Sequence, residues 1–260
     1  MAFHGKVALI TGGASGMGQA MALRLARAGA QVAVVDLNAE ALEATARQAG
    51  GIRAYPCDVS SSEQLQSVVE RVRAELGPID RLASAAGIMP ARSIVDMPAE
   101  RFAQVMRVNY EGTVNVVKSV LPQMLERRSG EIILFGSLAG VIFSKNFAAY
   151  GASKAAINAF GEVLAQELRN SGIRVLTVRP AAVNTPLISQ ATGEGGLTGL
   201  RKQARSGRMA SPEQIIDAVE AGLDKGLDVV YPNAEARIGQ WLRRLSPALT
   251  WKIANASQGG

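Results

Sequence analysis

Histidine and cysteine are almost absent from this sequence of 260 residues, which contains one of each. A Ser-His-Asp triad needs an imidazole beside its serine, and most catalytic zinc sites use imidazole ligands, so His4 alone argues against both. Cys57 has no partner for an internal disulfide, and we expect it to be a buried, inert thiol. We predict no metal site, and any chemistry must use carboxylates, lysine, tyrosine or a cofactor.

Long apolar runs are also missing. The first apolar run, residues 7–10, is too short for a signal peptide, and no run approaches the length of a membrane span. Aromatic residues make up 5% of the chain, and the basic residues behind its net charge of +6 are scattered, so we expect no nucleic-acid binding. These features, with the single cysteine, predict a cytoplasmic protein.

Short β-branched runs alternate with helical patterns along nearly the whole chain, which is typical of βαβ units and a parallel sheet. The apolar run 132–135 shows no polar alternation, as expected for a strand that helices cover on both faces. No linker-like stretch divides the chain, so we predict one catalytic domain over 1–260. The fold class is α/β: a Rossmann-type, doubly wound parallel sheet of seven strands with helices on both faces. The expected strands are 7–11, 31–35, 53–57, 79–84, 131–136, 174–179 and 229–231.

A glycine-rich turn, residues 11–18, follows the first expected strand and precedes a helical pattern at 20–28. Glycines permit a tight turn and the close approach of a pyrophosphate, and the N–H groups and dipole of a helix N-terminus attract its charge. A plain strand-to-helix turn is the alternative, but the order of strand, glycines and helix favours a dinucleotide site. The residues expected to hold the cofactor here are Gly12, Ser15, Gly16, Met17 and Gly18.

Asp36 follows Gly18 by eighteen residues, at the end of the second expected strand. A carboxylate there can accept hydrogen bonds from the adenosine ribose, and it would repel the 2′-phosphate of NADP. No lysine or arginine in 12–18 or beside Asp36 offsets this repulsion, so we expect NAD as cofactor rather than NADP. The alternative for Asp36 is a cap on the helix that starts near Ala39, a role that Asn38 could fill instead.

Asp58 and Val59 end the third expected strand. Asp58 either faces the adenine or caps the helix expected at 60–76, and both interpretations stay open.

Tyr150 and Lys154 are four residues apart in a long helical pattern, so they share one helical face. A phenol with a pKa near 10 is a poor base at neutral pH, and bringing that pKa near 7 requires roughly 4 kcal/mol. One cation about 5 Å away supplies roughly 3 kcal/mol at an effective dielectric constant near 20, so an ammonium group and a positive nicotinamide ring would together suffice. Tyr150 would then take a proton from an alcohol as its carbon gives up hydride, or return it.

Ser137 lies thirteen residues before Tyr150, at the end of the fifth expected strand. Its hydroxyl could donate a hydrogen bond to a substrate oxygen and polarise the C–O bond. The alternative is a turn serine before Leu138. Each signal is weak alone, but together with the glycine turn they indicate a hydride-transfer site.

Over residues 5–232 the sequence resembles the short-chain dehydrogenase/reductase family. The family's T-G-x-x-x-G-x-G motif matches 11–18, its D-V matches Asp58-Val59, and its Y-x-x-x-K matches Tyr150 and Lys154. The resemblance implies that Ser137 polarises the substrate and that Asn109, otherwise a poor choice within a helix, holds a water in a proton relay behind the lysine.

Two family motifs are altered. N-A-A-G reads Ser84-Ala85-Ala86-Gly87, and P-G reads Pro180-Ala181. A serine can still hydrogen-bond the backbone, whereas the methyl group of Ala181 restricts φ near the expected nicotinamide. Val183 and Thr185 match the positions that bind the carboxamide. Beyond the glycine turn and Asp36, the expected cofactor contacts are Leu37, Asp58, Val59, Ser84, Ala85, Ala86, Gly87, Tyr150, Lys154, Pro180, Val183 and Thr185.

Residues 182–210 are rich in glycine, including Gly193, Gly195, Gly196 and Gly199, and we expect a mobile substrate lid there. An apolar pocket under the lid is predicted, with ordinary core packing as the alternative. Its expected lining is Leu187, Ile188, Leu197, Leu200, Ile88, Met89, Val141, Ile142 and Phe143.

Small residues mark the helix of Tyr150, which carries alanines at 149, 152, 155, 156 and 159. Family members commonly assemble through this helix and the one expected at 100–127, so we expect a homodimer or homotetramer.

The tail, 233–260, extends beyond the family core and contains an amphipathic stretch at 235–245. We expect a pocket wall or a subunit contact first, and peripheral contact of 235–252 with an anionic membrane second. Its apolar stripe is Ile238, Trp241, Leu242 and Leu245, with Arg237, Arg243 and Arg244 facing away.

These features predict an NAD-dependent oxidoreductase that interconverts a secondary alcohol and a ketone of apolar, lipid-like character. The alternatives are an NADPH-linked ketone reductase of the same family, a non-catalytic dinucleotide sensor, and a membrane-associated scaffold that rests on the tail alone.

Overall fold

The computed structural model describes residues 3, 5–192, 197–207 and 209–256. Seven strands form one parallel sheet in the order β3-β2-β1-β4-β5-β6-β7, which confirms the predicted fold class. All seven expected strands are present, with ends within two residues of the prediction. They are β1 (Val7–Thr11), β2 (Gln31–Asp36), β3 (Ile52–Pro56), β4 (Arg81–Ser84), β5 (Gly130–Phe135), β6 (Ile173–Val178) and β7 (Val229–Val230).

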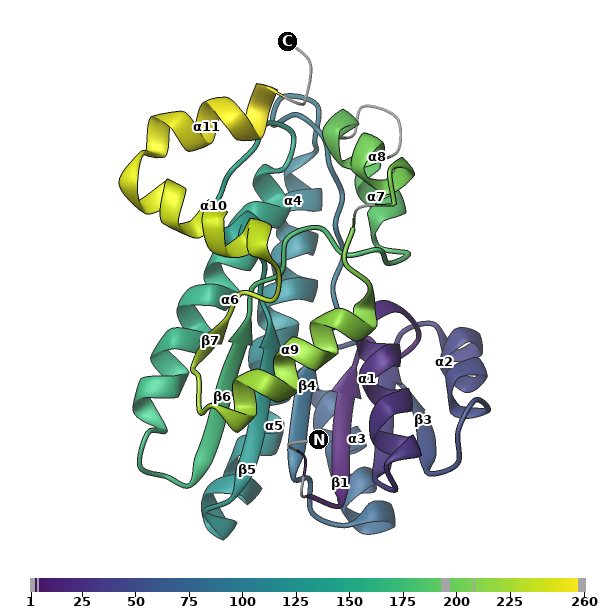
Figure 1. Cartoon of the computed structure of the whole chain (residues 1–260). Coiled ribbons are helices and arrows are strands. Elements are labelled where there is room, and N and C mark those ends of the chain that lie inside the picture. The colour runs from purple at the N-terminus through teal and green to yellow at the C-terminus, as the bar shows by residue number, and fades with distance from the viewer. Residues whose placement is uncertain (1–2, 4, 193–196, 208, 257–260) are drawn as a thin grey trace.

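Helices cover both faces of the sheet (Figure 1). One face packs against α3 (Ser62–Leu76), α5 (Gly112–Arg127) and α6 (Ala148–Glu167). The other packs against α1 (Gly16–Arg27), α2 (Ala39–Ala46) and α9 (Pro212–Asp224). Strand side chains alternate between these cores, which is why a strand buried on both sides is apolar throughout.

The strand order reverses at β1, which pairs with β2 on one side and β4 on the other. Chain connections leave the sheet in opposite directions from these strands, so a crevice opens at their carboxyl ends. The residues that end β1, β2, β4 and β5 therefore meet at one edge of the sheet.

The helix expected at 100–127 is interrupted. It consists of α4 (Ala99–Met106), a π-helical turn η1 (Arg107–Glu111) and α5. Asn109 lies in the π turn, and such turns frequently occur at functional sites.

The remaining elements lie near the carboxyl edge of the sheet. A short 3₁₀ helix, η2 (Leu138–Gly140), follows β5, and the expected lid contains α7 (Ile188–Thr192) and α8 (Thr198–Arg205). The tail forms α10 (Ala234–Leu245), as predicted, and α11 (Pro247–Ala256), which the sequence analysis missed although proline favours the first turn of a helix. Gly193, Gly195 and Gly196 lie outside the described residues.

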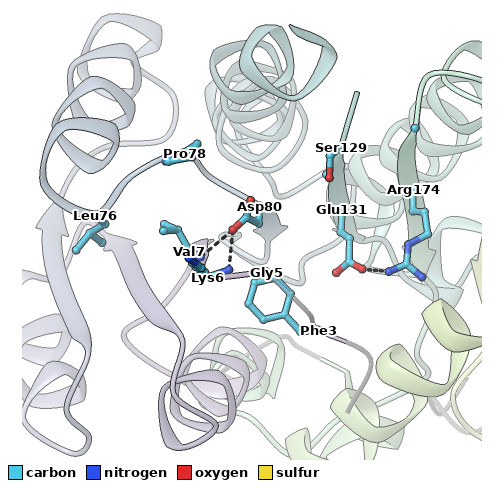
Figure 2. A pocket seen from close by; sticks show the side chains of 12 residues that line it. Phe3, Gly5, Lys6, Val7, Leu76, Pro78, Asp80, Ser129, Glu131 and Arg174 are labelled. Atoms are coloured by element: carbon cyan, nitrogen blue, oxygen red, sulfur yellow. Dashed lines mark hydrogen bonds and ion pairs between the residues drawn. The ribbon is translucent and has the colours of Figure 1, made fainter. Parts of the chain in front are cut away.

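A hollow of about 470 Å³ lies at the opposite edge, where the strands begin (Figure 2). Three of its charged groups are already paired: the carboxylate of Asp80 accepts hydrogen bonds from the backbone N–H groups of Lys6 and Val7, and Glu131 binds Arg174. The expected proton-transfer residues lie at the other edge of the sheet, so we do not assign the chemistry to this hollow.

Candidate active site

One cleft crosses the carboxyl edge of the sheet between β1 and β4. It consists of a hollow of about 290 Å³ beside the glycine turn and a hollow of about 440 Å³ beside Tyr150. The two adjoin, because Met17, Ala85, Gly87, Thr185 and Leu187 line both. The cleft thus runs from Asp36 to Tyr150.

The glycine turn requires residues without a side chain. Gly12 has a φ of 70°, and a Cβ there would lie 2.7 Å from the backbone nitrogen of Ala86. A Cβ on Gly18 would lie 2.3 Å from the carbonyl oxygen of Gly12. Ser15 precedes α1 without a side-chain cap, so the first-turn N–H groups of that helix can bind an anion. These residues fit the pyrophosphate of a dinucleotide.

Asp36 lines the same hollow at the end of β2. Its carboxylate accepts hydrogen bonds from the N–H groups of Ala14, at 3.3 Å, and Asn38, at 3.1 Å, which fix its position. Asn38 caps α2 by accepting from the N–H of Ala41 at 3.0 Å. The alternative role of Asp36 as the cap of this helix is therefore ruled out.

Asp58 also lines this hollow, and it holds the turn before α3. Its Oδ1 accepts from the backbone N–H and the hydroxyl of Ser60, at 2.9 and 2.8 Å. Ser61 is the cap of α3, so Asp58 does not cap the helix itself. Leu37, which is 75% exposed, and Val59 complete this side of the hollow.

Tyr150 and Lys154 lie side by side in the first turns of α6, and both are buried. The Nζ of Lys154 lies 5.7 Å from the centre of the Tyr150 ring and donates a hydrogen bond to the carbonyl oxygen of Phe135 at 2.7 Å. Phe147 stacks on the Tyr150 ring at 4.7 Å. Phe147 also lines the larger hollow, although the sequence analysis did not single it out.

Ser137 caps a short helix beside Tyr150, and its role in polarising a substrate stays a prediction. Its Oγ accepts a hydrogen bond from the N–H of Ala139 at 3.0 Å and so caps η2. Its side chain also hydrogen-bonds that of Tyr150. The serine and the phenol therefore converge on one point of the larger hollow.

Burial shifts both titratable groups of the site toward their neutral forms. It raises the pKa of Tyr150 to about 12, although the hydrogen bond with Ser137 acts in the opposite direction. Burial also lowers the pKa of Lys154 to about 8. In the protein without cofactor, Lys154 therefore does not bring the pKa of the phenol down as expected, because the rise caused by burial is larger. A phenolate at neutral pH would then require the positive nicotinamide ring beside Tyr150.

Asn109 connects the strand-end loop with α6. Its Nδ2 donates to the carbonyl oxygen of Ile88 at 3.0 Å and to the Oγ of Ser153 at 2.9 Å, while its Oδ1 accepts from the N–H of Ile88. Ser153 in turn donates to the carbonyl oxygen of Tyr150 at 2.8 Å. The asparagine side chain therefore positions the turn that carries the phenol, and its part in a proton relay stays a prediction.

The altered residue Ser84 donates to the Oγ1 of Thr113 at 3.1 Å, and Thr113 donates to the carbonyl oxygen of Asn109 at 2.7 Å. Ser84 thus reaches the backbone through a second hydroxyl instead of bonding it directly. The segment that follows is held by the Oγ1 of Thr11, which accepts from the N–H groups of Ala85 and Ala86.

Ala181 causes no backbone strain. Within the described part of the chain, the residues other than glycine with positive φ are Arg128 and Asn146, so this alanine adopts an ordinary conformation. Its N–H donates to the Oδ1 of Asn233 at 3.3 Å. Pro180, Val183 and Thr185 line the larger hollow together with it, as their expected place near the nicotinamide requires.

The larger hollow has an apolar wall that agrees in part with the prediction. Ile88 instead lines the smaller hollow, and Phe143 is exposed, with the guanidinium of Arg243 from α10 over its ring. The sequence also contained no signal for Gln203 of α8 and Ala254 of α11, because neither belongs to a motif. The predicted residues that do line it are Met89, Ile142, Leu187, Ile188, Leu197 and Leu200.

Comparisons with known proteins agree with this geometry. The chain is 36% identical to D-threitol dehydrogenase of Mycolicibacterium smegmatis, over 87% of this chain and 91% of that protein. It is 34% identical to 3-oxoacyl-(acyl-carrier-protein) reductase of Thermotoga maritima, over 84% and 90%. A solved short-chain dehydrogenase/reductase of Burkholderia phymatum in complex with NAD has a TM-score of 0.86 and 25% identity, over 96% of this chain and 97% of that one. The short chain dehydrogenase family matches residues 6–194. The chain therefore belongs to the short-chain dehydrogenase/reductase family and is an oxidoreductase with a nicotinamide dinucleotide cofactor.

Proposed function

We propose that this protein interconverts a secondary alcohol and a ketone of apolar character with NAD as its cofactor. The observation that carries the substrate class is the lining of the larger hollow. Among its described residues only Lys154 has a charged side chain, and that group is bonded to the Phe135 carbonyl. A substrate that carries a carboxylate or a phosphate would find no compensating charge there, whereas an apolar body would be well accommodated.

The side chains of this site divide the work of proton transfer. Ser137 donates a hydrogen bond to the substrate oxygen, and Tyr150 takes the hydroxyl proton during oxidation or returns it during reduction. Lys154 supplies positive charge beside the phenol. Pro180, Val183 and Thr185 would hold the nicotinamide, which would supply the acceptor or donor of the hydride.

A substrate screen tests this assignment directly. We expect secondary alcohols with large apolar bodies, such as hydroxysteroids and long-chain secondary alcohols, to reduce NAD, as followed by the absorbance of NADH. The polyol threitol and charged hydroxy acids should be much poorer substrates. A clear preference for threitol would contradict the apolar pocket, and the absence of turnover with every class would contradict the enzymatic assignment.

Asp36→Ala should weaken the preference for NAD over NADP. The carboxylate would no longer bond the ribose or repel a 2′-phosphate, and hydrogen bonds to a charged group are worth about 1.5–3 kcal/mol. The ratio of kcat/KM for NAD to that for NADP should fall by about tenfold to a hundredfold. Glu40→Ala, which removes an exposed carboxylate from the first turn of α2, is the matched control and should leave the ratio unchanged. Equal kcat/KM values of the wild-type enzyme with both cofactors would count against the assignment.

Alcohol oxidation should accelerate as the pH rises. Burial raises the pKa of Tyr150 to about 12, and the positive nicotinamide ring of bound NAD would lower it. Loss of the phenol proton creates the base that oxidation needs, so kcat/KM at saturating NAD should rise by up to about tenfold per pH unit below the pKa of the NAD-bound phenol. Ketone reduction needs the proton and should slow as the phenol loses it. Profiles that are flat between pH 6 and 9 in both directions would contradict the assignment of Tyr150 as the proton-transfer group.

We further propose that residues 182–210 form a substrate lid, because α7 and α8 contribute Ile188 and Leu200 to the wall of the larger hollow. We also propose that the chain assembles as a homodimer or homotetramer through α5 and α6. Ala152, Ala159 and Val163 are exposed along one side of α6, at a spacing that presents them to a neighbour.

A further inference from the structure

The tail gathers exposed apolar side chains on one hairpin, formed by α10 and α11, which projects beyond the carboxyl edge of the sheet (Figure 1). These side chains are 45% to 77% exposed, far more than a packed helix requires. They are Ile238, Trp241, Leu245, Leu249, Trp251 and Ile253.

Helix α10 turns its small residues toward the body of the protein and its large ones away from it. Ala236 is fully buried, and a Cβ on Gly239 would lie 2.6 Å from the Cδ1 of Ile142, so the helix packs closely through this side. Ile238, Trp241 and Leu245 recur at three and four residues and occupy a different side, which faces solvent. Ile238, Trp241 and Leu245 therefore do not pack on the chain's own core, and the expected subunit contact of the stripe stays a prediction.

The charges of the hairpin are mostly positive. Its one acidic residue, Glu235, lies in the first turn of α10, and residues 236–256 contain four cations and no acidic residue. Arg237 and Arg244 lie on α10 at a spacing of seven, beside the exposed stripe, while Arg243 lies over the Phe143 ring. Lys252 is exposed on α11.

Apolar side chains flanked by cations match an anionic lipid bilayer, whose acyl region takes the former and whose headgroups take the latter. A second copy of the chain fits this surface less well. In a two-fold symmetric contact the same surface of each copy would meet, and the four cations of one hairpin would repel the four cations of the other. No helix in the described ranges is long and apolar enough to cross a membrane, which limits the contact to the surface.

We propose that the α10–α11 hairpin docks the protein onto an anionic bilayer. Ala254 of α11 lines the larger hollow, and Asn255 accepts a hydrogen bond from the N–H of Lys145 at 2.7 Å, so the docked surface adjoins the substrate site. Docking would thereby bring the mouth of an apolar pocket to the lipid in which apolar substrates dissolve. This last consequence, unlike the docking itself, rests on the proposed function.

The chain carries its own probe for this test, because its two tryptophans, Trp241 and Trp251, both lie on the hairpin. Vesicles of phosphatidylglycerol and phosphatidylcholine should shift the tryptophan emission to shorter wavelength and sediment the protein. Vesicles of phosphatidylcholine alone should bind at least tenfold more weakly. Each of Arg244→Gln and Lys252→Gln should weaken binding about fivefold, as expected for a cation at an anionic surface.

Trp241→Glu should lower vesicle binding at least tenfold. Leu227→Glu is its matched control: it adds the same charge at a side chain 42% exposed, but before β7 and thus at the opposite edge of the sheet, and should bind as the wild type does. Circular dichroism would verify that both variants are folded. Equal binding of Trp241→Glu and wild type, or equal binding to both vesicle types, would overturn the proposal.

Two further measurements separate this proposal from its rivals. A concentration-dependent emission shift without vesicles, together with a lower mass for Trp241→Glu in light scattering, would identify the hairpin as a subunit contact and overturn docking on lipid. Turnover of a water-soluble secondary alcohol should be the same in Trp241→Glu and wild type. Its absence in both proteins would remove the proposed function and leave the docking result standing.

Discussion

Tyr150→Phe should lower turnover of the best alcohol substrate by about a thousandfold and leave the affinity for NADH within about threefold. General acid and base catalysis contributes about a hundredfold to ten-thousandfold, and this substitution removes the group proposed to supply it. The ring itself should stay in place, because Phe147 stacks on it and only the phenol oxygen is lost. Steady-state rates and titration of NADH fluorescence measure the two quantities.

Ser137→Ala should lower the rate less than Tyr150→Phe does, and it serves as the comparison variant. It removes the hydroxyl that bonds the phenol and the cap of η2, while the phenol remains, so the loss should be smaller, about a hundredfold. If Tyr150→Phe retained more than a tenth of the wild-type rate with NADH affinity intact, the phenol would not be the proton donor. If the NADH affinity fell as steeply as the rate, the residue would act in cofactor binding instead.

The central strands β1, β2 and β5 were predictable because they are buried on both faces and so read as nearly continuous apolar runs. The glycine turn was predictable because sterics permit nothing larger: the Cβ positions of Gly12 and Gly18 would fall within 3 Å of backbone atoms. Residues fixed by local geometry in this way leave a pattern in the sequence. Tyr150 and Lys154 belong to the same class, since their spacing alone brings them together on α6.

Features set by contacts between distant segments were not predictable. The position of the Asp36 carboxylate depends on its hydrogen bond from the N–H of Ala14 in the glycine turn, and the contribution of Ala254 to the substrate wall depends on how the tail folds back. The direction of the Tyr150 pKa shift follows from burial, which a spacing argument does not contain. The outward stripe of α10 could not be placed either, because periodicity gives the width of an apolar face and not what it faces.

Arg81 lies at the centre of a buried ion-pair cluster that no sequence motif predicts. The side chain is fully buried at the start of β4 and bonds Glu131 of β5 and Glu220 of α9, each at 2.6 Å. Phe3 lies over its guanidinium at 4.5 Å, and Arg174 bonds the second oxygen of Glu131. One cation thus ties two neighbouring strands to a covering helix, at the edge of the sheet opposite the cleft.

Arg81→Met should therefore lower the free energy of unfolding by about 3–5 kcal/mol, because removing one partner leaves buried carboxylates without their compensating charge. The melting temperature should fall by about 10 °C in a chain of this size. Arg53→Met, which breaks an exposed pair with Glu75, is the matched control and should cost less than about 1 kcal/mol. Thermal and urea unfolding measure both.

Further substitutions in the same cluster can show whether Arg81→Met loses stability because carboxylates are left unpaired or because the packing of the arginine is lost. Adding Glu131→Gln and Glu220→Gln to Arg81→Met removes both stranded charges while preserving side-chain volume, so most of the lost stability should return. Glu131 keeps Arg174 in the single variant, so Glu220→Gln should supply the larger share of that recovery. If the combined variant were no more stable than Arg81→Met alone, the contribution of Arg81 would lie in its packing beneath Phe3. The KM for the alcohol should stay unchanged throughout, because the cluster and the cleft lie at opposite edges of the sheet.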